Sequence, residues 1–209
     1  MNTGSRETRD GKADQTLMDV FRTSGAWLEG HFRLSSGLHS AGYLQSALVL
    51  QHPAHAAAIG ERLAAEVAGW APTVVLSPAL GGLIIGHEVA RAAGSRAIFA
   101  ERQDARLTLR RGFTLEPNDR VLVVEDVVTT GLSTRETIEV ARASGAMVVG
   151  AAAIVDRSEG RAGLDVPFVA LITLQVPAWK PEECPLCTQG LPLLKPGSRP
   201  AAGPPQPPN

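Results

Sequence analysis

The stretch from Val121 to Ser133, VLVVEDVVTTGLS, most constrains the fold of this chain. It starts with a run of apolar, mostly β-branched residues, which is typical of a strand buried on both faces of a parallel sheet. A glycine turn follows, and we predict that Ser133 begins a helix, with Glu136 completing a Ser-x-x-Glu capping box. Open α/β sheets bind ligands where a buried strand leads through such a turn into a helix.

The end of this strand and the start of the helix carry complementary chemistry. A helix N-terminus offers N–H donors and partial positive charge, so a phosphate group is the expected ligand. Glu125 and Asp126 end the strand. Two carboxylates above a phosphate site suit the hydroxyls of a sugar or a divalent metal ion. Alternatively, both acids only accept hydrogen bonds from loop N–H groups.

The segment from Glu125 to Ser133 resembles the phosphoribosyl-pyrophosphate motif of type I phosphoribosyltransferases, in which two acids and two hydrophobic residues precede Thr-Thr-Gly and a small residue. The GHFRLSSG segment that starts at Gly30 and the Asp-Arg-Ser turn at residues 156–158 narrow the resemblance to orotate phosphoribosyltransferases. It covers about Gly25 to Arg199. The implied reaction joins orotate to phosphoribosyl pyrophosphate, releases pyrophosphate and uses Mg²⁺.

The resemblance also implies roles for individual residues. Glu125 and Asp126 would hold the ribose hydroxyls and favour positive charge on the ring, and with Arg102 they are the expected catalytic residues. Thr129 and Arg157 would bind the orotate carboxyl group. Substrate oxygens and water would hold Mg²⁺, so no side chain is expected as a metal ligand. Phosphoribosyl pyrophosphate would contact Arg102 and the motif residues Glu125, Asp126, Val127, Val128, Thr129, Thr130, Gly131, Leu132 and Ser133.

A glycine-rich loop follows the predicted strand Thr73–Leu76 and precedes a predicted helix from Leu83 to Ala93. Its glycines have the spacing of a nucleotide-binding P-loop, but His87 and Glu88 stand where that motif needs Lys and Ser or Thr. The P-loop interpretation therefore fails. Residues 79–82 (ALGG) instead resemble the pyrophosphate loop of the family, the alternative being a plain strand-to-helix turn.

A basic segment lies between two predicted strands. We predict a strand over Arg96–Ala100 and then a polar, irregular segment over Gln103–Arg111, which suits a mobile lid for pyrophosphate; the alternative is a solvated loop. In the resembled family this loop reaches the neighbouring subunit's active site, which implies a homodimer with shared active sites. The family's Lys and His residues are absent from it, and Arg102 matches the first Lys. The other basic residues are Arg106, Arg110 and Arg111.

Arg157 follows the predicted strand Met147–Val155, so it should lie at the same edge of the sheet as Glu125. A guanidinium there can bind a carboxylate through two hydrogen bonds. The alternative is a salt bridge to Asp156 or Glu159.

Residues 30–45 are punctuated by Gly and Ser, which indicates short strands and turns. They resemble the hood that closes over the pyrimidine in orotate phosphoribosyltransferases, and the alternative is a surface hairpin without a ligand. In that alternative His31 and His39 would be ordinary polar loop residues, and neither is assigned a role. The family often has Lys where this chain has Ser35, so orotate specificity should depend more on Arg157.

Cys184 and Cys187 form a Cys-x-x-Cys pair, which is half of a zinc site. No second pair and no downstream histidine follows, so we expect a buried or redox-inactive pair rather than a metal site. These are the only two cysteines of the chain, too few for a disulfide framework.

Strands and helices alternate from Thr73 to Leu174, with a last strand over Phe168–Leu174, which predicts an α/β fold. We expect a type I phosphoribosyltransferase-like fold, with a mainly parallel sheet flanked by helices and a small N-terminal hood. A single domain should span residues 15–199, with the hood at about 15–50 and the core at about 53–175. Residues 1–14 and 200–209 are expected to be disordered extensions.

Composition restricts the function classes. Lys and Arg number 20 against 21 Asp and Glu, so charge indicates neither a nucleic-acid nor a membrane partner. No apolar run reaches the ~20 residues of a membrane span, and the cytoplasm is the expected location. Two alternatives to orotate transfer stay open: a phosphoribosyltransferase for another base, and a non-catalytic regulator that binds phosphoribosyl pyrophosphate. Such regulators usually carry a DNA-binding module, and residues 1–14 are too short to be one.

Overall fold

The computed structural model describes residues 16–34 and 36–195, which form two compact units. The first unit contains residues 16–26 and Gln45–Gln175, and the second contains Trp27–Leu44 and residues 176–195. The extensions expected at 1–14 and 200–209 lie outside the described residues, as does Ser35. Within the described ranges, no helix has the length and apolar character needed to cross a membrane.

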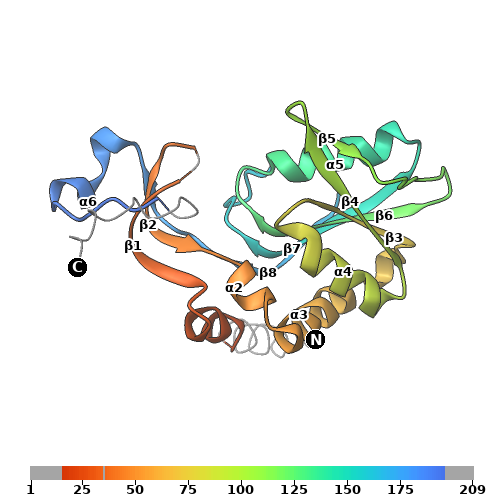
Figure 1. The fold of residues 1–209 in the computed structure, drawn as a ribbon, viewed down its shortest axis with the longest axis horizontal. Helices are drawn as coiled ribbons and strands as arrows, with labels where there is room; N and C mark the ends of the chain where they lie inside the picture. The colour runs from red at the N-terminus through yellow and green to blue at the C-terminus, as the bar shows by residue number, and fades with distance from the viewer. Residues whose placement is uncertain (1–15, 35, 196–209) are drawn as a thin grey trace, which may run out of the picture. The chain divides into compact units, whose positions relative to one another are not determined.

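The first unit is built on a six-stranded sheet with the strand order β5-β4-β3-β6-β7-β8 (Figure 1). All neighbouring strands are parallel except the edge pair β4 and β5, so the prediction of a mainly parallel sheet is confirmed. The strands are β3 (Val74–Pro78), β4 (Arg96–Gln103), β5 (Arg106–Leu109), β6 (Arg120–Val128), β7 (Met147–Asp156) and β8 (Phe168–Thr173).

Helices cover both faces of this sheet, with α5 on one side and α3 and α4 on the other (Figure 1). A helical segment over residues 16–23 starts the unit, and its apolar residues Leu17 and Phe21 are buried. The helices are α2 (Ala47–Leu50), α3 (Pro53–Glu66), the 3₁₀ turn η1 (Ala68–Trp70), α4 (Gly82–Ala93) and α5 (Leu132–Ala143).

The central strand β6 explains why this layered arrangement is stable. Val121 to Val124 are fully buried, because alternate side chains of a strand point to opposite faces and both faces are covered. Val121 and Val123 pack with Ile138 of α5 in one apolar cluster. Burying each such side chain contributes about 1.5–3 kcal/mol, so the strand is firmly fixed up to the point where its carboxylates begin.

The second unit has a three-stranded antiparallel sheet with the order β1-β2-β9. Two segments far apart in the sequence form it, because β9 comes from the C-terminal part of the chain. Its elements are β1 (Trp27–Arg33), β2 (His39–Leu44), β9 (Ala178–Trp179), the 3₁₀ turn η2 (Pro181–Glu183) and α6 (Pro185–Thr188).

Two sequence interpretations in this unit are wrong. His31 and His39 are not polar loop residues: they lie in β1 and β2, with exposed fractions of 3% and 5%. The Cys184–Cys187 pair was expected to lack further ligand side chains, but both histidines lie against it. The strand pairing brings His31 beside Cys184 across 153 residues of sequence, which no local motif can reveal.

Candidate active site

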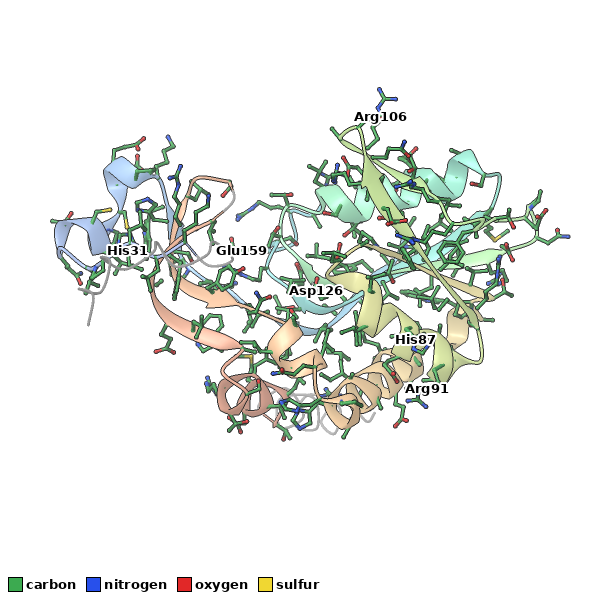
Figure 2. The ribbon with its side chains drawn as sticks, viewed as in Figure 1. His31, His87, Arg91, Arg106, Asp126 and Glu159 are labelled. Carbon is green, nitrogen blue, oxygen red and sulfur yellow. The ribbon has the colours of Figure 1, made fainter. Side chains whose placement is uncertain are left out.

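The carboxyl end of β6 forms one wall of a hollow of about 270 Å³ within the first unit. Strand β6 delivers Glu125 and Asp126 to this hollow, and the loop after β3 supplies another wall. Figure 2 labels Asp126. Its described lining residues are Pro78, Ala79, Gly81, Arg102, Leu107, Glu125, Asp126, Val127 and Ser133. The predicted pyrophosphate loop and the predicted sugar-binding acids therefore face the same space.

Glu125 is an unusual carboxyl group, because only 7% of its surface is exposed. Burial, together with the adjacent charge of Asp126 and the hydrogen bond between the two side chains, raises the pKa of Glu125 to about 9. At neutral pH Glu125 is therefore protonated and can donate a hydrogen bond, for example to a sugar hydroxyl, whereas positive charge close to it would favour its ionised form.

The loop between β3 and α4 approaches Asp126 so closely that a side chain on Gly81 would displace the carboxylate. A Cβ atom on Gly81 would lie 2.6 Å from Oδ1 of Asp126. The backbone of Gly81 is helical (φ −58°, ψ −43°), so the reason for glycine is this close approach rather than the backbone conformation. Gly86 of α4 similarly leaves no room for a side chain against the hydroxyl of Ser77.

Arg102 reaches the hollow from β4, where Glu136 of α5 holds it. Its Nη2 donates to Oε2 of Glu136 at 2.6 Å, and its Nη1 donates to the carbonyl oxygen of Ala105 at 2.6 Å. These contacts hold the guanidinium, and Arg102 lines the same hollow as the two acids. The ion pair also explains why the predicted capping box is wrong: Glu136 binds Arg102, and Ser133 lies inside α5, whose N-cap is Gly131 and makes no side-chain cap hydrogen bond.

The segment predicted to be irregular, Gln103–Arg111, is mostly an antiparallel hairpin. Strand β4 continues to Gln103 and β5 returns along it from Arg106 to Leu109. The two turn residues, Asp104 and Ala105, both have positive φ angles, as tight hairpin turns require.

The hairpin arginines differ in their surroundings. Arg111 donates two hydrogen bonds to Glu101, at 2.7 and 2.8 Å, and these lower the pKa of Glu101. Arg106 is exposed at the hairpin tip (Figure 2). Arg110 is also exposed. Arg111 thus forms an ion pair with Glu101 of the same hairpin, while Arg106 and Arg110 face solvent.

The loop from Thr129 to Gly131 joins β6 to α5 and is held by Arg135. Nη1 of Arg135 donates to the carbonyl oxygens of Thr130, at 2.9 Å, and of Ala162. Gly131 has φ +73°, and a Cβ atom on it would collide with the Ala162 carbonyl, so both backbone conformation and space require glycine here.

Arg157 lies where the sequence predicted, at the carboxyl edge of the sheet. Its backbone N–H donates to the carbonyl oxygen of Val128 at 2.8 Å, which places it beside the residue that precedes Thr129. Beside it, Oδ1 of Asp156 accepts from the N–H of Ser158, and Glu159 pairs with Arg161.

Comparison with known proteins identifies the family. Residues 46–185 match the phosphoribosyl transferase domain. An orotate phosphoribosyltransferase of Pelotomaculum thermopropionicum is 54% identical over 183 residues, covering 88% of this chain and 96% of that protein. This chain belongs to the orotate phosphoribosyltransferase family.

Solved structures of orotate phosphoribosyltransferases share the fold. The enzyme from Aeropyrum pernix matches with a TM-score of 0.62 and 31% identity, over 76% of this chain and 93% of that one. The Mycobacterium tuberculosis enzyme, in complex with phosphoribosyl pyrophosphate, matches with a TM-score of 0.61 and 26% identity, over 78% of this chain and 96% of that one. The type I phosphoribosyltransferase fold expected from the sequence is therefore confirmed.

Two residues that contribute to this candidate active site, Glu136 and Leu107, were not predicted from the sequence. Glu136 positions Arg102 although 34 residues separate the two, and no local sequence pattern predicts such an ion pair. Leu107 also lines the hollow. Its alternation with polar neighbours in Arg106-Leu107-Thr108-Leu109 was an available signal for strand β5.

Proposed function

We propose that this chain transfers the 5-phosphoribosyl group from phosphoribosyl pyrophosphate to orotate, giving orotidine 5′-monophosphate and pyrophosphate in pyrimidine biosynthesis. The observation that carries the proposal is the hollow at the end of β6, where paired acids, a close-approach glycine loop and an arginine converge in a chain that is 54% identical to an orotate phosphoribosyltransferase. In the reaction the C1–O bond to pyrophosphate breaks, a C1–N bond to orotate forms, and the orotate nitrogen gives up its proton.

Glu125 and Asp126 would act on the sugar. Both carboxyl groups face the hollow, and the protonated form of Glu125 can donate to a ribose hydroxyl while Asp126 accepts from one. Positive charge that develops on the ring as pyrophosphate leaves would favour the ionised form of Glu125, so that both carboxylates, fixed at the end of a buried strand, would stabilise that charge.

The 5′-phosphate would bind at Thr129–Ser133. The N-terminus of α5 presents N–H groups and a partial positive charge there, and the hydroxyls of Thr129, Thr130 and Ser133 add donors. Thr130 already uses its Oγ1 to accept from the N–H of Leu132 at 3.3 Å, which shapes the loop. Val127, Val128 and Gly131 would contribute backbone contacts to the same substrate.

The pyrophosphate would lie between the loop at Ala79–Gly82 and Arg102. The guanidinium of Arg102 is held toward the hollow by Glu136, so it can neutralise charge on the leaving group. The oxygen-rich donor set of the hollow suits Mg²⁺, which when bound would supply further positive charge to the pyrophosphate. Substrate oxygens and water would be its main ligands, so we assign no side chain as a direct one.

Orotate would bind through its carboxylate to Arg157 and Thr129. This assignment is supported by the hydrogen bond from the backbone N–H of Arg157 to Val128, the residue that precedes Thr129 at the carboxyl edge of the sheet. A guanidinium can bind a carboxylate with two parallel hydrogen bonds, and this would select orotate over bases that lack the carboxylate.

A homodimer with shared active sites is also part of the proposal. Its support is the exposed hairpin arginines Arg106 and Arg110, which face solvent instead of the hollow of their own chain, as residues that serve a second subunit would. Light scattering should give twice the mass of the chain. Mixing an inactive Asp126→Asn chain with an inactive Arg106→Ala/Arg110→Ala chain should restore activity through hybrid sites, and no restoration would contradict the sharing.

The deciding experiment follows the loss of orotate absorbance when protein, Mg²⁺, phosphoribosyl pyrophosphate and orotate are mixed. Parallel reactions with uracil, adenine and hypoxanthine test the other bases. We expect turnover with orotate alone. Turnover with another base and not with orotate would replace the proposed substrate, and binding of phosphoribosyl pyrophosphate without turnover of any base would favour a regulator.

A further inference from the structure

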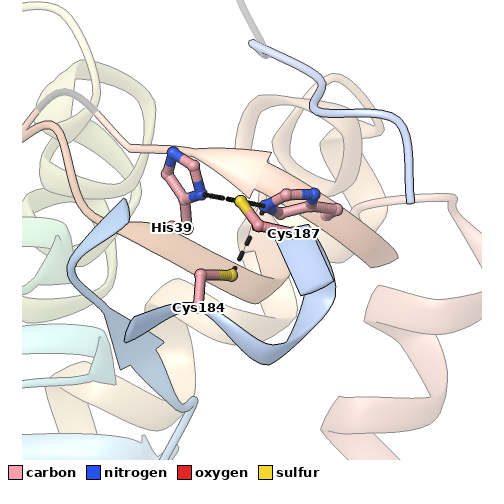
Figure 3. Close-up of side chains that lie close together, drawn as sticks. His39, Cys184 and Cys187 are labelled. Carbon is pink, nitrogen blue, oxygen red and sulfur yellow. Dashed lines mark hydrogen bonds between the residues drawn. The ribbon is translucent and has the colours of Figure 1, made fainter. Parts of the chain in front are cut away.

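Four potential metal-binding side chains meet in the second unit (Figure 3). His31 comes from β1 and His39 from β2. Cys184 immediately precedes α6, and Cys187 lies within it. One nitrogen or sulfur atom from each residue lies within 4.8 Å of all the others. Both histidines and Cys184 are buried, while Cys187 is exposed. The cluster is built from residues of one unit and lies outside the proposed catalytic machinery.

The separations between these atoms match a tetrahedral site. Sγ of Cys184 lies 3.5 Å from Nε2 of His31, and Sγ of Cys187 lies 3.7 Å from the same nitrogen and 3.2 Å from Nδ1 of His39. The two nitrogens are 2.9 Å apart. Four ligands bound to Zn²⁺ at 2.0–2.3 Å in a tetrahedron lie about 3.3–3.8 Å from one another. These four separations differ from that range by at most about 0.4 Å, and the remaining separations, up to 4.8 Å, would shorten by about 1 Å as the side chains close around the ion.

The ring of His31 is held in the orientation that a metal ligand needs. Its Nδ1 lies 2.9 Å from the carbonyl oxygen of Leu191, which can only accept a hydrogen bond. Nδ1 must therefore carry the proton, and in the neutral ring Nε2 presents its lone pair toward the cysteines. A backbone carbonyl that fixes the tautomer in this way is the usual second partner of a metal-bound histidine.

The second unit also lacks the apolar core that would make such a cluster unnecessary. Among its described residues, the buried apolar side chains other than Cys184 are Phe32 and Leu44. Its centre is occupied instead by His31 and His39, which are polar. Small units with so little apolar burial are usually stabilised by disulfides or a structural metal. Cys184 and Cys187 are free cysteines and form no disulfide.

We propose that His31, His39, Cys184 and Cys187 bind a structural Zn²⁺ ion that joins the β1–β2 hairpin to the C-terminal segment. Two thiolates and two imidazoles favour zinc over the oxygen-preferring Mg²⁺. The two thiols release their protons to solvent on binding, so Zn²⁺ and two thiolates form a neutral centre. Four protein ligands fill the tetrahedron and leave no position for a substrate, so the ion stabilises the fold and does not take part in phosphoribosyl transfer.

The first test measures metal in the full-length, reduced protein. Mass spectrometry of the purified protein should find about one zinc ion per chain. After removal of the metal, Co²⁺ should bind and give the thiolate-to-cobalt charge-transfer band and the strong visible bands of a tetrahedral site. Reduced protein that takes up neither Zn²⁺ nor Co²⁺ would overturn the proposal, as would octahedral cobalt spectra without a thiolate band.

Matched variants locate the ion. Cys184→Ser/Cys187→Ser and His31→Ala/His39→Ala should each weaken zinc binding by more than about 100-fold, since loss of a supporting partner alone costs 10–100-fold. His52→Ala/His55→Ala removes the same number of histidines from an exposed pair and should keep the zinc. Unchanged zinc content in the Cys variant would refute the assignment. If the site variants fail to fold, the cobalt titration of the unaltered chain decides.

Discussion

Replacing Gly81 by alanine should damage catalysis without damaging the fold. The new Cβ atom would lie 2.6 Å from Oδ1 of Asp126, whereas ordinary contacts begin at 3.4 Å, so the carboxylate must move by about 0.8 Å. Displacing a catalytic group by about 1 Å can cost 10²-fold in rate, and we expect a loss of that order in kcat/KM. The helical backbone angles of Gly81 suit alanine, so the free energy of unfolding should not fall.

Steady-state assays of orotate consumption and urea unfolding test this together. Gly69→Ala is the matched control, because a Cβ atom there meets no atom within 4 Å, and it should keep full activity. If the loss acts through Asp126, adding Gly81→Ala to an Asp126→Asn chain should cost little more than Asp126→Asn alone. A Gly81→Ala enzyme within about twofold of the unaltered rate would refute the argument, since ordinary surface changes alter little.

Asp126→Asn itself should lower turnover by about 10²-fold, the scale of one preorganised electrostatic contact, and unchanged turnover would remove Asp126 from the mechanism. Arg157→Ala should weaken orotate binding by about 10–100-fold and phosphoribosyl-pyrophosphate binding less; equal losses in isothermal titration would contradict its role. Glu125 has a pKa of about 9 in the folded chain and an ordinary pKa near 4.5 in the unfolded chain. Between pH 4.5 and pH 9 the folded chain therefore keeps the proton of Glu125, whereas the unfolded chain has lost it. The free energy of unfolding should therefore fall by up to about 1.4 kcal/mol per unit as pH rises from 4.5 to 9, and urea unfolding of Glu125→Gln should lack this slope.

The central motif could be predicted from the sequence because its information is local. A buried strand, two acids and a glycine turn are consecutive, and the structure places Glu125, Asp126 and Ser133 around one hollow as expected. The exact start of α5 could not be predicted, because a Ser-x-x-Glu pattern does not show that a distant arginine binds the glutamate. Gly131, with its positive φ angle, is the N-cap instead, and α5 starts at Leu132.

Two features were missed from the sequence, strand β5 and the cluster around Cys184. The arginine-rich stretch after β4 was interpreted by its charge, although Leu107 and Leu109 alternate with polar residues as an edge strand requires. The cluster around Cys184 was missed for a different reason. Its histidines precede the cysteines by about 150 residues and lie on β1 and β2, and no short pattern encodes the pairing of β2 with the distant strand β9.

Arg135 bonds to the carbonyl groups of Thr130 and Ala162, so one side chain ties two loops together. One loop is the expected phosphate site, and the other is the turn that follows Arg157. A loop transplanted from a relative keeps this anchor only if its backbone carbonyl lies where Arg135 can reach it. Protein engineers who seek a different base preference should therefore design both loops around this arginine.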